Sequence, residues 1–173
     1  MSTDSQAAAS PHPGRAHLDA LIAELAIDMP MVTHPPVFTV EEAEQHPHGL
    51  PGLDTKNLLL KDAKGQLFLV TMRADRRADL KALPAIIGSK RLSFASAETL
   101  FEALGVTPGS VTPLAMINDT QRRVTFSLDR ALAEAAHIAC HPLVNTATVS
   151  LTTADFFRLL RAVGVEPAVV DLD

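Results

Sequence analysis

TKNLLLKDAKGQLFLVTM, residues 55–72, is the stretch that decides the fold. Two leucine-rich runs, KNLLLKD and QLFLVTM, flank Asp62-Ala-Lys-Gly65. Apolar runs on either side of a short turn that contains glycine predict a β-hairpin. Lys56 and Asn57 stand where the first strand begins. A lysine there is typical of a surface strand end, with its stem lying over Leu58 and Leu60.

Helices and strands alternate irregularly on both sides of this hairpin. Thr39 with Glu42, Ser96, and Thr152 or Thr153 have the positions of helix N-caps. Such a pattern predicts an α/β (α+β) fold, in which helices surround a mixed, largely antiparallel sheet. The expected helices cover residues 17–27, 39–46, 75–83, 96–105, 129–135 and 154–164, and further strands cover 90–96, 114–118, 123–128, 137–144 and 146–151.

The chain of 173 residues has the length of one ordinary domain. Residues 1–14 are small, polar and proline-bearing, which indicates a flexible tail before a single domain over 15–173. The start has no signal-peptide pattern, and no apolar run approaches the ~20 residues of a membrane span. A single cysteine, Cys140, excludes an intramolecular disulfide. We therefore expect a soluble, cytoplasmic protein with no membrane partner.

Charge is distributed unevenly along the chain. The net charge is -5, which argues against a nonspecific nucleic-acid binder. The segment 56–91 nevertheless carries nine basic and three acidic residues, a net charge of +6. This segment is either an ordinary solvated face or a landing site for phosphates. Phenylalanine is the only aromatic residue type, which argues against a base-stacking platform.

Several kinds of chemistry find no matching pattern. The seven histidines are scattered, and only His46 and His48 are close in sequence, so we expect no metal site and no cofactor. Cys140 and His141 are adjacent and would point to opposite faces of a strand, so they cannot form a dyad. Phosphate-binding glycine motifs and a nucleophile elbow are absent from the sequence.

Two further polar spots allow two interpretations each. Gly109-Ser-Val-Thr-Pro113 is either a simple turn or a turn that aims backbone N–H groups at a carbonyl oxygen or an anion. His141 and Asn145 interrupt a run that otherwise looks like buried strand. They form either a satisfied core pair or the wall of a site.

Taken in order, HPPVFTVEEA, GLDTKNLLLKD, KRLSFASAETLFEALGVTPGSVTPLAMIND and HPLVNTATVSL resemble the free-standing prolyl-tRNA editing proteins of the YbaK-like superfamily. The resemblance covers residues 34–171. It implies the editing-domain fold and hydrolysis of the ester that joins a misplaced alanine to the 3′ end of proline tRNA. It also implies the acceptor end of tRNA(Pro) as partner, with prolyl-tRNA synthetase as a possible second one.

The resemblance also implies roles for individual residues. Lys56 corresponds to an essential lysine and His141 to the histidine of the last block. A hydroxyl of the terminal ribose helps to activate water in this family, so no acid–base dyad or metal is needed. The expected substrate-binding residues are Asn57, Gly109, Ser110, Val111, Thr112, Pro113 and Asn145. MPMVTHPPVF, residues 29–38, is a candidate pocket wall.

Cys140 departs from the family pattern, because a bulky aromatic is expected before His-Pro. A smaller residue would widen the pocket and relax its size limit. Two other readings therefore stay open: a deacylase of another small mischarged tRNA such as Cys-tRNA(Pro), and a non-catalytic module that binds tRNA or synthetase. In each case we expect a monomer.

Overall fold

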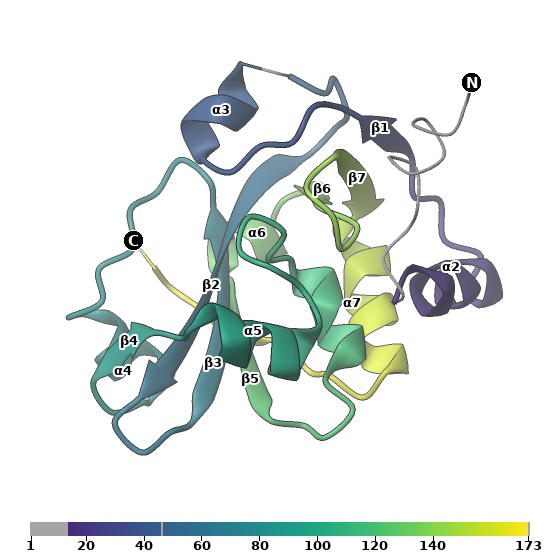
Figure 1. The fold of residues 1–173 in the computed structure, drawn as a ribbon. Helices are drawn as coiled ribbons and strands as arrows, with labels where there is room; N and C mark the ends of the chain where they lie inside the picture. Colours follow the sequence, from purple (N-terminus) through teal and green to yellow (C-terminus); the bar gives the residue numbers. More distant parts are fainter. Residues whose placement is uncertain (1–13, 46, 173) are drawn as a thin grey trace.

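The structure, a computed structural model, describes residues 14–45 and 47–172. An eight-stranded mixed sheet has the order β1-β7-β6-β2-β3-β5-β8, and β4 adds to β2 beside this path. Figure 1 shows the long strand β2 crossing the centre of the molecule. The strands are β1 (Met31–Thr33), β2 (Leu53–Asp62), β3 (Leu67–Arg73), β4 (Leu92–Phe94), β5 (Val124–Asp129), β6 (His137–Cys140), β7 (Ala147–Thr152) and β8 (Ala168–Val170). The helices are α2 (Arg15–Glu24), α3 (Val40–Glu44), α4 (Leu83–Ile87), α5 (Ala97–Leu104), the 3-10 helix η1 (Pro113–Asn118), α6 (Arg130–Ala133) and α7 (Thr153–Ala162).

The predicted hairpin is present as the antiparallel pair β2–β3, with Lys56 opposite Met72 and Lys61 opposite Leu67. Asp62 closes its turn, because its carboxylate accepts hydrogen bonds from the backbone N–H groups of Lys64 and Gln66. The same carboxylate accepts the N–H of Lys90 and so ties the approach to β4 to the hairpin.

Side chains of the hairpin alternate between two hydrophobic cores. Leu59 and Leu69 belong to the larger core, which α2, α5, η1 and α7 complete on one face of the sheet. Leu60 and Val70 belong to a smaller core that α4 covers on the other face. Successive strand residues point to opposite faces, so a strand buried on both sides reads as a continuous apolar run.

The sheet is mixed, as expected. Pairs β1–β7, β7–β6, β2–β3 and β2–β4 are antiparallel, whereas β2–β6, β3–β5 and β5–β8 are parallel. The contact between β2 and β6 is the weak point, because only Leu53 and Asp54 pair with that strand. Beyond Asp54 the two strands separate, and this split opens the site described below.

Helix starts follow the predicted caps. The side chains of Thr39, Ser96 and Thr152 each accept a backbone N–H three residues on, from Glu42, Thr99 and Asp155. Thr152 rather than Thr153 is therefore the cap of α7. The predicted tail, residues 1–14, lies almost wholly outside the described residues, and α2 begins at Arg15. No helix among the described residues is long and apolar enough to cross a membrane.

Two predicted elements were wrong, and a third was predicted too long. Residues 114–118 form part of η1 and no strand, because Pro113 at the first helical position and the Thr112 cap start a helical turn. Residues 75–82 form turns separated by irregular chain, and the helix expected over 75–83 begins only at Leu83, with proline in its first turn. Strand β6 ends at Cys140, because Pro142 cannot donate to a sheet ladder.

Candidate active site

The split between β2 and β6 holds a cavity with a volume of about 890 Å³. Segments far apart in the sequence contribute to it, including the predicted site residues Lys56, Asn57, Gly109, Val111 and His141. The other predicted residues, Ser110, Thr112, Pro113 and Asn145, lie behind its surface. The remaining lining residues are His34, Val37, Phe38, Thr39, Ala43, Glu44, Pro47, His48, Gly49, Leu50, Gly52, Leu53, Asp54, Thr55, Arg73, Ala74, Asp75, Ala139, Cys140 and Thr148.

His141 is held in one tautomer. Its Nδ1 lies 2.8 Å from the carbonyl oxygen of Ala147 and therefore donates to it. Nε2 is then the unprotonated nitrogen, and no residue in the described part of the chain occupies it. Burial lowers the pKa of His141, since a charged ring is disfavoured away from water, and the nearby His34 lowers it further. The neutral ring thus presents a lone pair.

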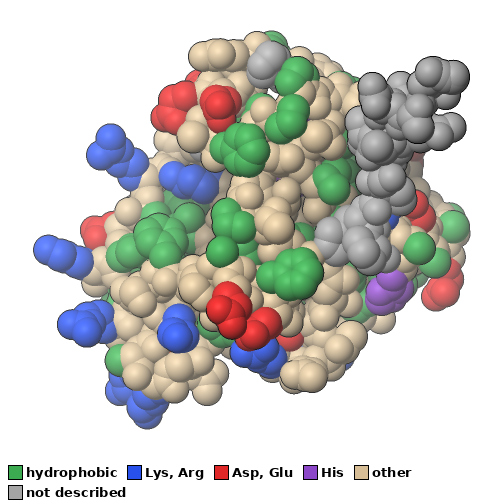
Figure 2. Space-filling model, in the orientation of Figure 1, with side chains coloured by type: hydrophobic (Ala, Val, Ile, Leu, Met, Phe, Trp, Pro, Cys, Tyr) green, Lys and Arg blue, Asp and Glu red, His purple; other side chains and the backbone are tan. Residues whose placement is uncertain are grey.

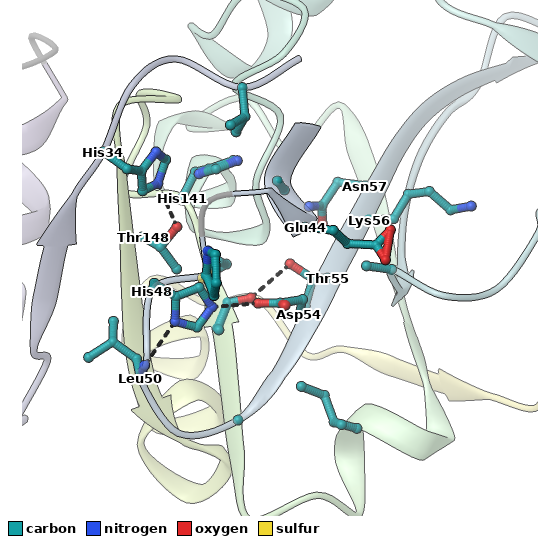
Figure 3. A pocket seen from close by; sticks show the side chains of 18 of the residues that line it. His34, Glu44, His48, Leu50, Asp54, Thr55, Lys56, Asn57, His141 and Thr148 are labelled. Atoms are coloured by element: carbon teal, nitrogen blue, oxygen red, sulfur yellow. Dashed lines mark hydrogen bonds and ion pairs between the residues drawn. The ribbon is translucent and has the colours of Figure 1, made fainter. Parts of the chain in front are cut away.

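His34 and Thr148 continue this wall. His34 Nδ1 donates to the carbonyl of Pro35 at 2.8 Å, and Nε2 lies 2.9 Å from the Thr148 hydroxyl. The rings of His34 and His141 are tilted, with centroids 6.1 Å apart. Figure 3 shows His34, Thr148 and His141 gathered on one side of the pocket. We call these three residues the histidine wall.

The loop Gly109–Pro113 supports the histidine wall from behind. Thr112 is completely buried, and its hydroxyl donates to the carbonyl of His141 at 2.6 Å. Ser110 uses its N–H in a bond to the Thr107 carbonyl, and Pro113 has none, so neither can offer a donor to a ligand. Within the described residues, the N–H groups of Gly109 and Val111 have no acceptor, and both residues line the cavity.

Asn57 and Asn145 are structural anchors of the site. Asn57 accepts from Thr71 at 2.6 Å and donates to the carbonyl of Val111 at 3.2 Å, which fixes the distance between β2 and the loop. Asn145 donates to the Val37 carbonyl at 3.0 Å. Segment 34–38 is thereby held against the cavity. Of the predicted pocket wall 29–38, His34, Val37 and Phe38 line the cavity, whereas residues 29–33 do not.

A second part of the lining is charged, and we call Lys56, Asp54, Arg73 and Asp75 the charged rim. Lys56 points away from the histidines and donates to the carbonyl of Arg76. Arg73 binds Asp75 through two bonds of 3.0 and 2.7 Å, and Asp54 accepts from His48 at 2.8 Å. Figure 2 shows lysines and arginines gathered on the side of β2 and β4, whereas acidic side chains gather over α3.

Neither a reactive thiol nor a metal cluster is present in this lining. Burial raises the pKa of Cys140 to about 12, so its thiol stays protonated and unreactive. Among the described residues, no group of three or more His, Cys, Asp or Glu side chains could hold a metal ion. The arrangement instead offers what ester hydrolysis needs: amide donors, a neutral imidazole and a cation around one cavity.

Comparison with known proteins identifies the family. The sequence pattern of the aminoacyl-tRNA editing domain matches residues 34–159, from His34 to the middle of α7. The chain belongs to the aminoacyl-tRNA editing domain family.

Two similar proteins have names that refer to prolyl-tRNA synthetase or to prolyl-tRNA editing. The chain is 42% identical over 169 residues to prolyl-tRNA synthetase associated domain-containing protein 1 of Danio rerio, covering 96% of this chain and 92% of that protein. It is 39% identical to the prolyl-tRNA editing protein ProX of Acetoanaerobium sticklandii, covering 84% and 89%.

Solved structures share the fold at lower identity. A proposed trans-editing enzyme for prolyl-tRNA synthetase matches with a TM-score of 0.67 and 21% identity, covering 94% of this chain and 99% of that one. The hypothetical protein APE2540 matches with a TM-score of 0.67 and 20% identity, covering 88% and 97%.

Sequence reasoning missed several lining residues of this editing domain. Thr148 and His34 were not singled out, because each stands alone in a strand or loop pattern. The two residues are brought together only by strand pairing, because β1 runs antiparallel to β7. Just beyond β1, the N–H of His34 donates to the carbonyl of Thr146. His48 and Asp54 were missed for a similar reason, because their bond spans a loop rich in proline and glycine.

Proposed function

We propose that the protein is a trans-editing hydrolase that deacylates mischarged Ala-tRNA(Pro). One observation carries this proposal: a single cavity is lined by Lys56, His141 and the Gly109 turn, which lie far apart in sequence. The names of the relatives support prolyl-tRNA as the substrate class. The reaction breaks the ester between the alanyl carbonyl carbon and a ribose oxygen, with water as the second reactant.

In this proposal the N–H groups of Gly109 and Val111 stabilise the negative charge that develops on the carbonyl oxygen. An aminoacyl ester is already activated, so placing water and stabilising the oxyanion are sufficient tasks for the protein. One such donor contributes on the order of 10²–10³ in rate. The bond from Asn57 to the Val111 carbonyl keeps this part of the loop in position.

His141 positions the attacking water or the α-amino group through the lone pair of Nε2. Its Nδ1–H bond to Ala147 and the Thr112 bond to its own carbonyl hold the ring before substrate arrives. A hydroxyl of the terminal ribose assists as a proton relay, as the family resemblance implies: it accepts a proton from the attacking water while it gives its own proton to the leaving ribose oxygen. Alanine and intact tRNA are then released.

Lys56 anchors the phosphate or ribose of the terminal nucleotide. In the structure its ammonium is bound to the neutral carbonyl of Arg76, a partner that a phosphate outcompetes because the acceptor is then charged as well as the donor. A point charge of this kind aligns the ester and need not act as a base. We further propose that the protein works as a cytoplasmic monomer and that prolyl-tRNA synthetase is its second partner, which supplies the mischarged tRNA.

The decisive experiment is a deacylation panel with Ala-, Cys-, Ser- and Pro-tRNA(Pro), run with EDTA and without added metal. We expect rapid release of alanine and slow release of proline, since a ring larger than alanine clashes with the pocket. If no ester is hydrolysed but tRNA binds tightly, the protein is a binding module. Fluorescence anisotropy with uncharged tRNA(Pro) separates this outcome from a protein that does not recognise tRNA.

Cysteine is the second candidate for the aminoacyl group. Cys140 lines the cavity and is nearly buried, where a small side chain leaves room for a substrate slightly larger than alanine. Comparable kcat/KM values for Cys- and Ala-tRNA(Pro) would favour it. A preference for alanine of tenfold or more would reject it.

A further inference from the structure

The cavity contains one chemically distinct part that neither the histidine wall nor the charged rim accounts for. Phe38 lines the cavity, yet 66% of its surface is exposed. We infer that Phe38 is the stacking surface for the adenine of the 3′-terminal nucleotide. This inference deepens the proposed function, on which it rests.

Phe38 is held in place on both sides along the chain. Its own N–H donates to the Glu42 carboxylate at 2.9 Å, at the start of α3. The preceding residue, Val37, makes two hydrogen bonds with Asn145: its carbonyl accepts from the Asn145 side-chain amide, and its N–H donates to the Asn145 carbonyl. An exposed ring on a tethered backbone loses little conformational entropy when a base packs on it.

The edge of the Phe38 ring occupies the space where a side chain at position 109 would lie. A Cβ atom at this position would lie 2.8 Å from Cδ1 and 3.3 Å from Cε1 of Phe38, and the φ angle of +92° also favours glycine. The ring therefore packs closely against the turn that offers the oxyanion donors. A base stacked on Phe38 would be adjacent to the reacting ester, as the geometry of an aminoacylated nucleoside requires.

Other rings in the lining are less suited to stacking. His34 and His48 each have both ring nitrogens engaged by protein groups. His141 is mostly buried. Phe38 is thus the one non-histidine aromatic ring among the described lining residues. A single ring suffices for a single base, even though the sequence lacks an extended aromatic platform.

Charge determines which part of the nucleotide lies beside Phe38. Helix α3 carries Glu41, Glu42 and Glu44 directly after it, and Glu44 also lines the cavity. These carboxylates repel a phosphate but not a neutral base. The phosphate is then directed to Lys56 on the charged rim, which gives the nucleotide one orientation.

The test uses two non-hydrolysable ligands: adenosine 5′-phosphate with alanine joined to its 3′ carbon through an amide, and the same compound without the base. Affinities are measured calorimetrically for wild type, Phe38→Ala, Phe38→Tyr and the control Phe101→Ala, whose ring is 60% exposed on α5. We expect Phe38→Ala to weaken binding of the adenosine compound by roughly 5- to 150-fold. Binding of the base-free compound should not change, and Phe38→Tyr should resemble wild type.

Equal losses for both compounds would show that Phe38 is only a wall, and would overturn the inference. An unchanged affinity in Phe38→Ala would overturn it too, as would failure of wild type to prefer the adenosine compound. Neither ligand is hydrolysed, so the result is independent of catalysis. Base-dependent binding without deacylation of any tRNA would retain the adenine site and reject the proposed hydrolase function.

Discussion

The histidine wall and the charged rim face the same cavity but are built differently. In the wall, side chains are partly or fully buried and hydrogen-bonded to the protein: Thr148 is 7% exposed, His34 and His141 are half-buried, and Thr112 behind them is fully buried. In the rim, the side chains of Asp54 and Asp75 are each 63% exposed, and Lys56 has a neutral carbonyl as partner. One part is organised before substrate binds, and the other can exchange partners.

Under the proposed function, this difference suits the two parts to different tasks. Preorganised groups in a buried setting stabilise developing charge without reorganising, which suits the bond-breaking step. Exposed ion pairs contribute little to stability, about 0–1 kcal/mol, and are screened by salt. They can therefore be released cheaply when a polyanion such as the tRNA acceptor end arrives.

The largest effect should come from Lys56→Ala on the rim. We expect kcat/KM for Ala-tRNA(Pro) to fall by about 10²-fold or more, because a misplaced ester loses most of the benefit of orientation. Lys61→Ala is the matched control, since Lys61 is an exposed lysine at the far end of the same strand. Equal turnover of Lys56→Ala and wild type would remove the rim from the mechanism.

His141→Gln tests the wall. We expect a loss of about 10–10²-fold in kcat. Burial lowers the pKa of His141, so the neutral, active ring persists as the pH falls through its ordinary value of 6.5. The ratio of wild-type to variant rates should therefore stay constant across that pH and decline only in more acidic solution. A ratio that declines already above pH 6.5 would contradict a neutral, buried ring.

Gly109→Ala tests the junction between the wall and Phe38. The added methyl group would meet the Phe38 ring, and alanine is strained at a φ of +92°. We expect a loss of about 1–3 kcal/mol in the free energy of unfolding, measured by urea denaturation. Gly65→Ala in the hairpin turn, at φ +83° but with no neighbour within 4 Å of the new Cβ, separates backbone strain from steric contact.

The smallest effect should come from Cys140→Ser. With its pKa raised to about 12, the thiol is not a nucleophile, and we expect kcat/KM to stay within about threefold of wild type. Iodoacetamide at neutral pH should leave the wild-type activity intact. Rapid inactivation that the serine variant escapes would mean that the thiol is accessible and reactive.

Local sequence patterns predicted those parts of the fold that depend on near neighbours. The hairpin, the caps at Thr39 and Ser96, and the glycine end of α5 each need only a few consecutive residues. Prediction was wrong where a proline changed the local outcome, as at Pro113 and Pro84. The apolar run 114–118 resembled a strand, and the charged run 75–83 resembled a helix. In both places the proline ring fixed where a helical turn begins.

By itself the sequence determined the mixed α/β class, the family resemblance and the identities of Lys56, Gly109 and His141 as residues of interest. The sequence also pointed to segment 29–38 as a pocket wall, but tertiary structure alone decided that Thr148 lines the cavity and that Ser110, Thr112 and Asn145 support it from behind. The physical reason is the early separation of β2 from β6. That split depends on how distant strands pair, which no local periodicity encodes.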